Sequence, residues 1–199
     1  MAGIHTQVFD PPPINFGEML RYAGIARETS ELKALAESVL QEAMEKFVYR
    51  VCWAEFPVVF SREKIDLGFA VTESKDLRKN LTGCEHVILF AATVGLEIDR
   101  LIRRYTAIDP ARAVMLQALG VERVESLCDA FNEQVRAQQT AAGRSINSRY
   151  SPGYGDLPLE LQKDVIAALD CTRKIGVTLG NNLLMSPSKS VTALIGIKG

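Results

Sequence analysis

The chain has 199 residues, 47% of them hydrophobic, and its 23 basic and 24 acidic residues leave a formal net charge of −1. That composition supports a substantial buried core and argues against a nucleic-acid binder, which carries a basic surface. Four cysteines far apart in sequence and only two histidines disfavour disulfide staples, a zinc site and a Ser-His triad, so we expect reduced, buried thiols.

The sequence shows no targeting or membrane segment. MAGIHTQVFDPPPINF lacks the basic region and apolar core of a secretory signal. The longest continuous apolar run, 87–92, is far shorter than the roughly 20 residues that a membrane-spanning helix needs. We therefore expect a soluble, cytoplasmic protein with no membrane or nucleic-acid partner, organised as a single domain over residues 1–199.

In chain order, the first predicted elements are helical. Three prolines at 11–13 form a stiff lead-in, and a short helix is predicted from Phe16 to about Ile25. A long amphipathic helix is predicted to follow, with Ser30 as its N-cap. Its apolar residues recur at three- and four-residue steps: Leu32, Leu35, Val39, Ala43, Phe47 and Val51.

The middle of the chain alternates between strands and helices. Short strands at 58–61 and 64–71 and a helix at 74–81 lead to a nearly continuous apolar run at 87–94. Such a run is typical of a central strand that is covered on both faces. A helix is predicted to start directly after Gly95.

The second half begins with a strong helix signal, because Asp109 can act as N-cap and Pro110 fits the first helical position. This helix is predicted to reach about Thr140, with Gly120 marking either a break or a close packing point. A helix at 159–169 and strands at 175–179, 183–185 and 190–197 follow. The pattern indicates a mixed α+β fold and disfavours a doubly wound parallel sheet.

Two segments could bind an anion or a cation. ATVGLEIDRLIRR places a glycine between a strand and a helix, but Glu97 and Asp99 in the first turn would repel phosphate, which favours a structural helix start.

The second segment is the long helix, on which Glu122 and Glu133 are interpreted as part of a solvated face. Glu125 lies at the edge of the apolar stripe and needs a partner, for which an internal arginine and a ligand ammonium are equally good candidates.

The stretch RYSPGYGDLP contains several residues with special backbone requirements. Ser151, Pro152, Gly153 and Tyr154 fit a type II turn, which lets backbone approach a flat ligand closely. Arg149 could grip a carboxylate at two points. A small zwitterionic or heteroaromatic ligand is one interpretation, and a rigid structural turn beside a surface arginine is the other.

The same stretch, with the helix VESLCDAFNEQVR and the tail LLMSPSKSVTALIG, resembles the activation domain of cobalamin-dependent methionine synthase, in particular its short free-standing activation subunits. The resemblance covers roughly residues 110–199. It implies an α+β fold with a largely antiparallel sheet packed by long helices. It also implies an S-adenosylmethionine site formed by the following residues: Glu125, Arg149, Ser151, Pro152, Gly153 and Tyr154. A family aspartate near the domain start has no equivalent placed in INFGEMLRYAG, and the histidine after the loop is replaced by Glu160 or a neighbour.

The resemblance further implies a role in reactivation. The chain would act as a subunit of a methyltransferase system and would position the methyl group of S-adenosylmethionine for reductive methylation of cob(II)alamin. Because no Asp-x-His-x-x-Gly motif is present, cobalamin would be carried by a partner, a methionine synthase or related corrinoid protein. An electron donor such as a flavodoxin would supply the electron. Two alternatives stay open: a non-catalytic adaptor that docks on a corrinoid protein, and a ligand-binding protein of unrelated purpose.

Overall fold

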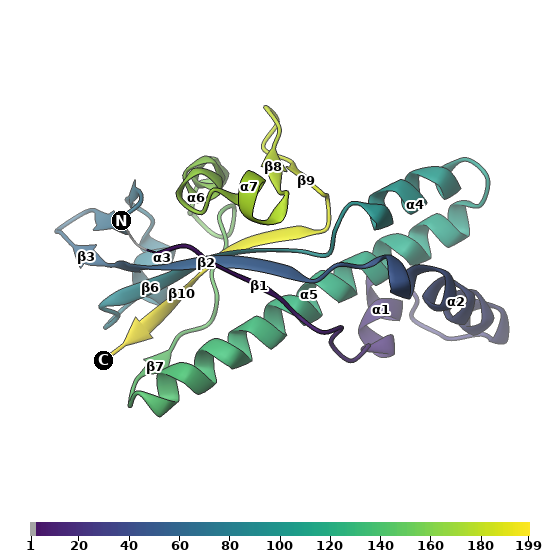
Figure 1. Cartoon of the computed structure of the whole chain (residues 1–199), viewed down its shortest axis with the longest axis horizontal. Helices are drawn as coiled ribbons and strands as arrows, with labels where there is room; N and C mark the ends of the chain where they lie inside the picture. The colour runs from purple at the N-terminus through teal and green to yellow at the C-terminus, as the bar shows by residue number, and fades with distance from the viewer. Residues whose placement is uncertain (1–2) are drawn as a thin grey trace.

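The computed structural model describes residues 3–199 and is built on a five-stranded antiparallel sheet (Figure 1). The sheet order is β1-β2-β6-β10-β7. Its strands, in that order, are β1 (His5–Val8), β2 (Arg50–Pro57), β6 (His86–Thr93), β10 (Ser190–Lys198) and β7 (Ser145–Ile146). Every neighbouring pair is antiparallel, which confirms the predicted α+β class and excludes a parallel sheet among the described residues.

The predicted central strand is confirmed as β6, which pairs along its whole length with β2 on one side and β10 on the other. Its side chains alternate between two hydrophobic clusters. Val87, Leu89 and Ala91 belong to one cluster, and Ile88 and Phe90 belong to the other. Because both faces of the strand are covered, its sequence is continuously apolar instead of alternating with polar residues.

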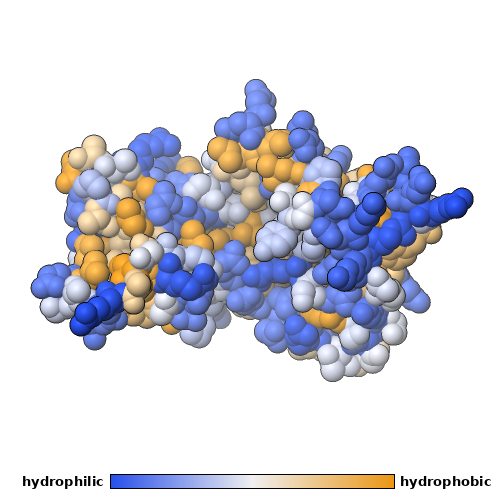
Figure 2. Space-filling view, turned by 180° about the vertical axis from the view of Figure 1, so that it is seen from behind, coloured by the Kyte–Doolittle hydropathy of each residue, from blue (hydrophilic) through white to orange (hydrophobic). Residues whose placement is uncertain are grey.

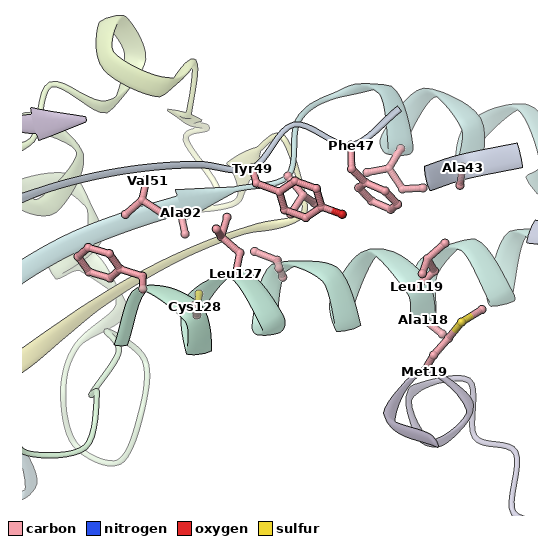
Figure 3. Packing of buried hydrophobic residues seen from close by; sticks show 14 of the residues in the cluster. Met19, Ala43, Phe47, Tyr49, Val51, Ala92, Ala118, Leu119, Leu127 and Cys128 are labelled. Carbon is pink, nitrogen blue, oxygen red and sulfur yellow. The ribbon is translucent and has the colours of Figure 1, made fainter. Parts of the chain in front are cut away.

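A layer of helices covers the face to which Phe90 points. These helices are α1 (Phe16–Tyr22), α2 (Ser30–Ala43), the 3₁₀ turn η1 (Met44–Lys46), α4 (Glu97–Thr106) and α5 (Pro110–Ala141). Helix α5 crosses the sheet and continues past it, where α1, α2 and α4 gather around its first half (Figure 1). Figure 3 shows Leu127 of α5 facing Val51 and Ala92 of the sheet, and Met19 of α1 facing Ala118.

Short elements cover the opposite face. The helices are α3 (Lys75–Asn80), η2 (Leu159–Leu161), α6 (Gln162–Ala168) and α7 (Cys171–Ile175). Two small sheets comprise β3 (Val59–Phe60), β4 (Ile65–Asp66) and β5 (Val71–Thr72), and β8 (Thr178–Leu179) with β9 (Met185–Ser186). Seen from behind, the surface of the molecule shows separate hydrophobic areas between hydrophilic residues (Figure 2).

The helix predicted to extend from Ser30 to Val51 is wrong in its second half. The α-helix ends at Ala43, and Val51 lies in β2, which the prediction missed. Phe47 and Val51 are both buried, so they continued the helical spacing of the stripe although the chain there is extended. The N-cap is also one residue earlier than predicted, because the Thr29 side chain accepts the N–H of Leu32 at 3.3 Å.

Other boundaries differ in the second half. The strand predicted at 175–179 is mostly not extended, because Ile175 ends α7 and Gly176 adopts a left-handed φ of 76°. The strand predicted at 64–71 divides into β4 and β5, while the short edge strands β1 and β7 were missed. The helix start at Asp109 and Pro110 is confirmed. Gly120 proves to be a packing point, because a Cβ there would lie 2.9 Å from Cε of Lys189.

Candidate functional site

An arginine held by two carboxylates forms the centre of the candidate site. Arg149 donates from Nη2 to Oε2 of Glu125 at 2.6 Å and from Nη1 to Oδ1 of Asp129 at 2.7 Å. The two carboxylates are four residues apart on α5 and therefore face the same side of the helix. The side chains are 26% exposed for Arg149, 37% for Glu125 and 73% for Asp129, so the cluster opens progressively toward solvent.

The sheet directs Arg149 toward α5. The neighbouring Tyr150 exchanges two 2.8 Å backbone hydrogen bonds with Leu194, which extends the edge of β10. Successive side chains of an extended strand point to opposite faces. Tyr150 packs against the cluster under α3 and α6, so Arg149 points to the other face, where α5 lies.

The cluster keeps Arg149 charged. Partial burial disfavours the guanidinium, but surrounding negative charge, including Glu125 and Asp129, outweighs it and raises the pKa of Arg149 above its usual value. Partial burial and then the Glu125 carboxylate raise the pKa of Tyr22 on α1, so this phenol stays protonated. Burial raises the pKa of the Cys128 thiol beneath, which therefore stays neutral.

The predicted type II turn is present immediately after Arg149. Tyr154 N–H donates to the Ser151 carbonyl at 3.1 Å, and Gly153 has a φ of 86°, as the third position of such a turn requires. Pro152 is buried, whereas the Tyr154 ring is 72% exposed and meets the Tyr150 ring edge-on at 6.0 Å. Within residues 3–199, the Ser151 N–H and the carbonyls of Pro152 and Gly153 have no hydrogen-bond partner.

The rest of the loop is fastened to α3. A Cβ on Gly155 would collide with Asp76 and lie 2.6 Å from the Tyr150 hydroxyl, so the close backbone approach here is to the protein itself. The Asp156 carboxylate accepts the Ser74 hydroxyl and the N–H of Lys75 at 2.8 Å, and caps α3. These contacts explain why the loop needs its second glycine and its aspartate without any ligand.

A buried ion pair builds the opposite wall of the site. Arg123 and Glu122 are paired at 2.5 Å, and both side chains are at most 1% exposed, so the predicted solvated position of Glu122 is wrong. Arg123 donates to the carbonyls of Pro12 and Pro13 at 2.6 and 2.8 Å, and Glu122 accepts the N–H of Asn15 at 2.9 Å. The pair thereby ties the proline-rich N-terminal segment to α5.

An open groove of about 540 Å³ lies between this segment and α5. It is lined by Pro12, Pro13, Ile14, Asn15, Phe16, Ser126, Asp129, Ala130 and Glu133. Glu133 is 68% exposed, as predicted. A second hollow of about 510 Å³ lies beside the turn, next to Tyr150, Tyr154 and Gly155. The structure thus brings Glu125 and Arg149 together and places the turn at the edge of a separate hollow.

Sequence reasoning missed two contributors to this region: Asp129 and Arg123. The four-residue spacing of Glu125 and Asp129 was a usable signal, since an arginine can bridge such a pair. No local pattern marks Arg123 as buried, because its partners Pro12 and Pro13 lie far earlier in the chain.

The remaining expectations concern metals, thiols and membranes. All four cysteines are free and buried, as predicted. In the described part of the chain, no group of three His, Cys, Asp or Glu side chains is arranged to hold a metal ion, and no helix is long and apolar enough to cross a membrane. The helix start after Gly95 is structural, since Asp99 accepts the Ser188 N–H and hydroxyl at 2.7 and 2.6 Å.

Comparisons with known proteins found a match to a family model and a match to a solved fold. Residues 74–198 match the family model of the vitamin B12 dependent methionine synthase activation domain. Among solved structures, the chain is similar to the crystal structure of the MetH reactivation domain bound to AdoHcy. That match has a TM-score of 0.75 and 16% identity and covers 98% of this chain and 78% of the other. No curated protein matches the chain.

Proposed function

The chain belongs to the family of the vitamin B12 dependent methionine synthase activation domain, and from this premise we propose that it binds S-adenosylmethionine for reactivation of a cobalamin-dependent methionine synthase. The observation that carries the proposal is Arg149, which is held by Glu125 and by Asp129, a residue that lines an open groove. The AdoHcy bound to the matched reactivation domain carries the same amino-acid group as S-adenosylmethionine. A site for that group needs one cation to bind its carboxylate and one anion to bind its ammonium.

The cluster suits a zwitterion because both of its partners can be exchanged. The ligand carboxylate takes a two-point contact on Arg149 in place of one of the protein carboxylates. The freed carboxylate, Glu125 in our proposal, receives the ligand ammonium. When the Arg149–Glu125 pair separates, Arg149 therefore pairs with the ligand carboxylate and Glu125 pairs with the ligand ammonium. No partly buried ion is left unpaired.

The turn follows Arg149 directly in the chain, borders the separate hollow beside Tyr150 and provides the second part of the proposed site. The Ser151 N–H and the carbonyls of Pro152 and Gly153 are free to bind the adenosyl group. Gly153 lacks a side chain and so allows close approach, while the Tyr154 ring and hydroxyl remain exposed beside it. We propose that these backbone groups and Tyr154 hold the base and ribose.

The chain contributes position and charge to the reaction. When bound, S-adenosylmethionine supplies the methyl group, which passes to a cobalamin carried by a methionine synthase or related corrinoid partner after one electron arrives from a donor such as a flavodoxin. Arg149 and Glu125 fix the amino-acid end of the ligand, and the turn fixes the adenosyl end. Holding both ends orients the methyl group without a general acid or base.

A second candidate is an adaptor that docks on a corrinoid protein without using the ligand. The two short ion pairs of Arg149 favour this candidate, because they give the guanidinium partners within the chain and leave it no need for a ligand carboxylate. Both candidates take residues 1–199 as one activation-like domain. The single five-stranded sheet, with a core cluster on each face, supports that unit.

Calorimetric titration with S-adenosylmethionine separates the two candidates. We expect binding to the wild-type chain and a loss of about 1.5–3 kcal/mol for Arg149→Ala, the range for a charge-assisted hydrogen bond. Arg173→Ala is the matched control, because it removes an arginine that pairs with Asp170 at 2.5 Å on α7. Absence of binding at millimolar ligand would reject the proposal and favour the adaptor.

A further inference from the structure

We propose that Asp129 makes the groove selective for the positively charged sulfonium ligand over its neutral thioether product, so that methyl transfer itself weakens binding and promotes release. This inference rests on the proposed function. It assigns Asp129 a specificity role that the site residues predicted from the sequence did not include.

The charge of the cluster gives the first step. Arg149 contributes one positive charge, and Glu125 and Asp129 contribute two negative charges, so the three side chains together carry a net charge of −1. The amino-acid group of the ligand is a zwitterion with no net charge, and its binding leaves this imbalance in place. A ligand with one additional positive charge neutralises the site, whereas a ligand without it does not.

Neighbouring cations do not cancel the imbalance, because each has its own carboxylate. Arg136 is 3.3 Å from Glu133 at the rim of the groove. Arg21 on α1 pairs with Glu18, and Arg123 is buried against Glu122. Within residues 3–199, the ion pairs around the groove are therefore internally balanced, and the negative charge in excess belongs to the cluster at Arg149.

The position of Asp129 identifies it as the residue that carries the excess negative charge of the cluster. Glu125 is the more buried carboxylate and is assigned to the ligand ammonium. Asp129 is 73% exposed and lines the groove directly. Once a ligand carboxylate shares Arg149, the Asp129 carboxylate is left facing the groove with a weakened partner. It is then available to attract a second positive charge on the ligand.

The chemistry of the reaction removes that second charge. The S–CH₃ bond breaks with its electron pair staying on sulfur, so the sulfonium becomes an uncharged thioether. The methyl group passes to the corrinoid of the partner, which has taken up one electron from the donor. Substrate and product thus differ by a methyl group and one unit of charge, and the groove responds to the charge.

The expected discrimination is modest because the groove is open to water. A single charge interacting with a net opposite charge at this exposure corresponds to roughly a three- to ten-fold difference in affinity. Salt screens such interactions, with a Debye length of about 10 Å at 0.1 M ionic strength. The difference between the two ligands should therefore decrease as the ionic strength rises.

The test is calorimetric titration of the full chain with S-adenosylmethionine and with S-adenosylhomocysteine at low and high salt. We expect the sulfonium to bind roughly three- to ten-fold more tightly at low salt. In Asp129→Asn this ratio should approach one, while the thioether retains most of its affinity. Asp164→Asn is the matched control, because it removes one exposed negative charge from α6 and should leave the ratio unchanged.

Each result has a distinct meaning. Equal affinity of the wild-type chain for both ligands, or an unchanged ratio in Asp129→Asn, would overturn the selectivity and leave the proposed function standing. Equal loss of the ratio in Asp129→Asn and Asp164→Asn would also overturn it, since overall charge would then account for the effect. Failure of both ligands to bind the wild-type chain would overturn the proposed function and this inference together.

Discussion

Two ion clusters stand within one turn of each other on α5 and serve opposite purposes. The Glu122–Arg123 pair is closed, because both side chains are buried and form hydrogen bonds with Pro12, Pro13 and Asn15 of the N-terminal segment. The Arg149 cluster is open, with its outer carboxylate 73% exposed at a groove. The same residue types thus build a wall in one case and the proposed ligand site in the other. What differs is whether the chain itself or the solvent occupies the remaining hydrogen-bonding positions.

The largest expected effect tests the closed cluster. Arg123→Met leaves the Glu122 carboxylate buried without its partner and should reduce the free energy of unfolding by about 3–5 kcal/mol. Arg149→Met, the equivalent change in the open cluster, should cost about 0–1 kcal/mol, because solvent can hydrate the carboxylates that lose the guanidinium. Urea unfolding of both variants measures the contrast. Similar losses in the two variants would remove the distinction between the clusters.

An intermediate effect on stability is expected from Gly155, in the loop that follows Arg149 and packs against α3. Gly155→Ala forces a side chain into a φ of 53° and against the ends of Asp76 and Tyr150, and should cost about 1–3 kcal/mol. Gly143→Ala is the control, because its φ of 74° brings the same backbone strain with no atom within 4 Å of the new Cβ. We expect about 1 kcal/mol for the control. Equal urea midpoints for the two variants would show that the loop is not packed as described.

The smallest expected effect concerns Asp156, which is exposed but has fixed partners. The hydrogen bond from Ser74, followed by the Lys75 N–H, lowers the pKa of Asp156. A lowered folded-state pKa means that the carboxylate stabilises the fold above its unfolded pKa of about 3.9 and loses this contribution as the pH falls through the folded value.

Urea midpoints of the wild-type chain and Asp156→Asn therefore should differ at pH 7 and converge as the pH falls from about 4 through the lowered pKa of the folded state, where the carboxylate becomes protonated. Asp156 is exposed like the open cluster but has internal partners like the closed one, and the pH dependence shows which of the two it resembles. A difference that stays constant from pH 7 to pH 2 would show that the loss is not electrostatic.

Elements set by nearby residues could be predicted from the sequence. The strand at 87–94 follows from its continuous apolar run, and the start of α5 follows from Asp109 and Pro110. The turn at 151–154 needs only proline and glycine at their required positions. In each case the deciding interactions lie within a few residues, so the pattern is visible locally.

Elements set by distant partners could not be predicted. Phe47 and Val51 continued the stripe of α2, but Val51 lies in β2, whose strand partners β1 and β6 are distant in sequence. Glu122 looked solvated because its cover, the N-terminal segment, lies far away in sequence. For the candidate site, the sequence identified Glu125 and Arg149 separately. Their contact depends on Tyr150 pairing with Leu194, which turns Arg149 toward α5.

The central claim is that the open cluster delivers the methyl group of S-adenosylmethionine to a corrinoid partner. The most direct test follows the disappearance of cob(II)alamin on a cobalamin-loaded methionine synthase partner, with a chemical reductant and S-adenosylmethionine present, with and without this chain. We predict that the wild-type chain and Arg173→Ala accelerate methylation and that Arg149→Ala does so far less at the same ligand concentration. Equal methylation rates with and without the wild-type chain would contradict the claim.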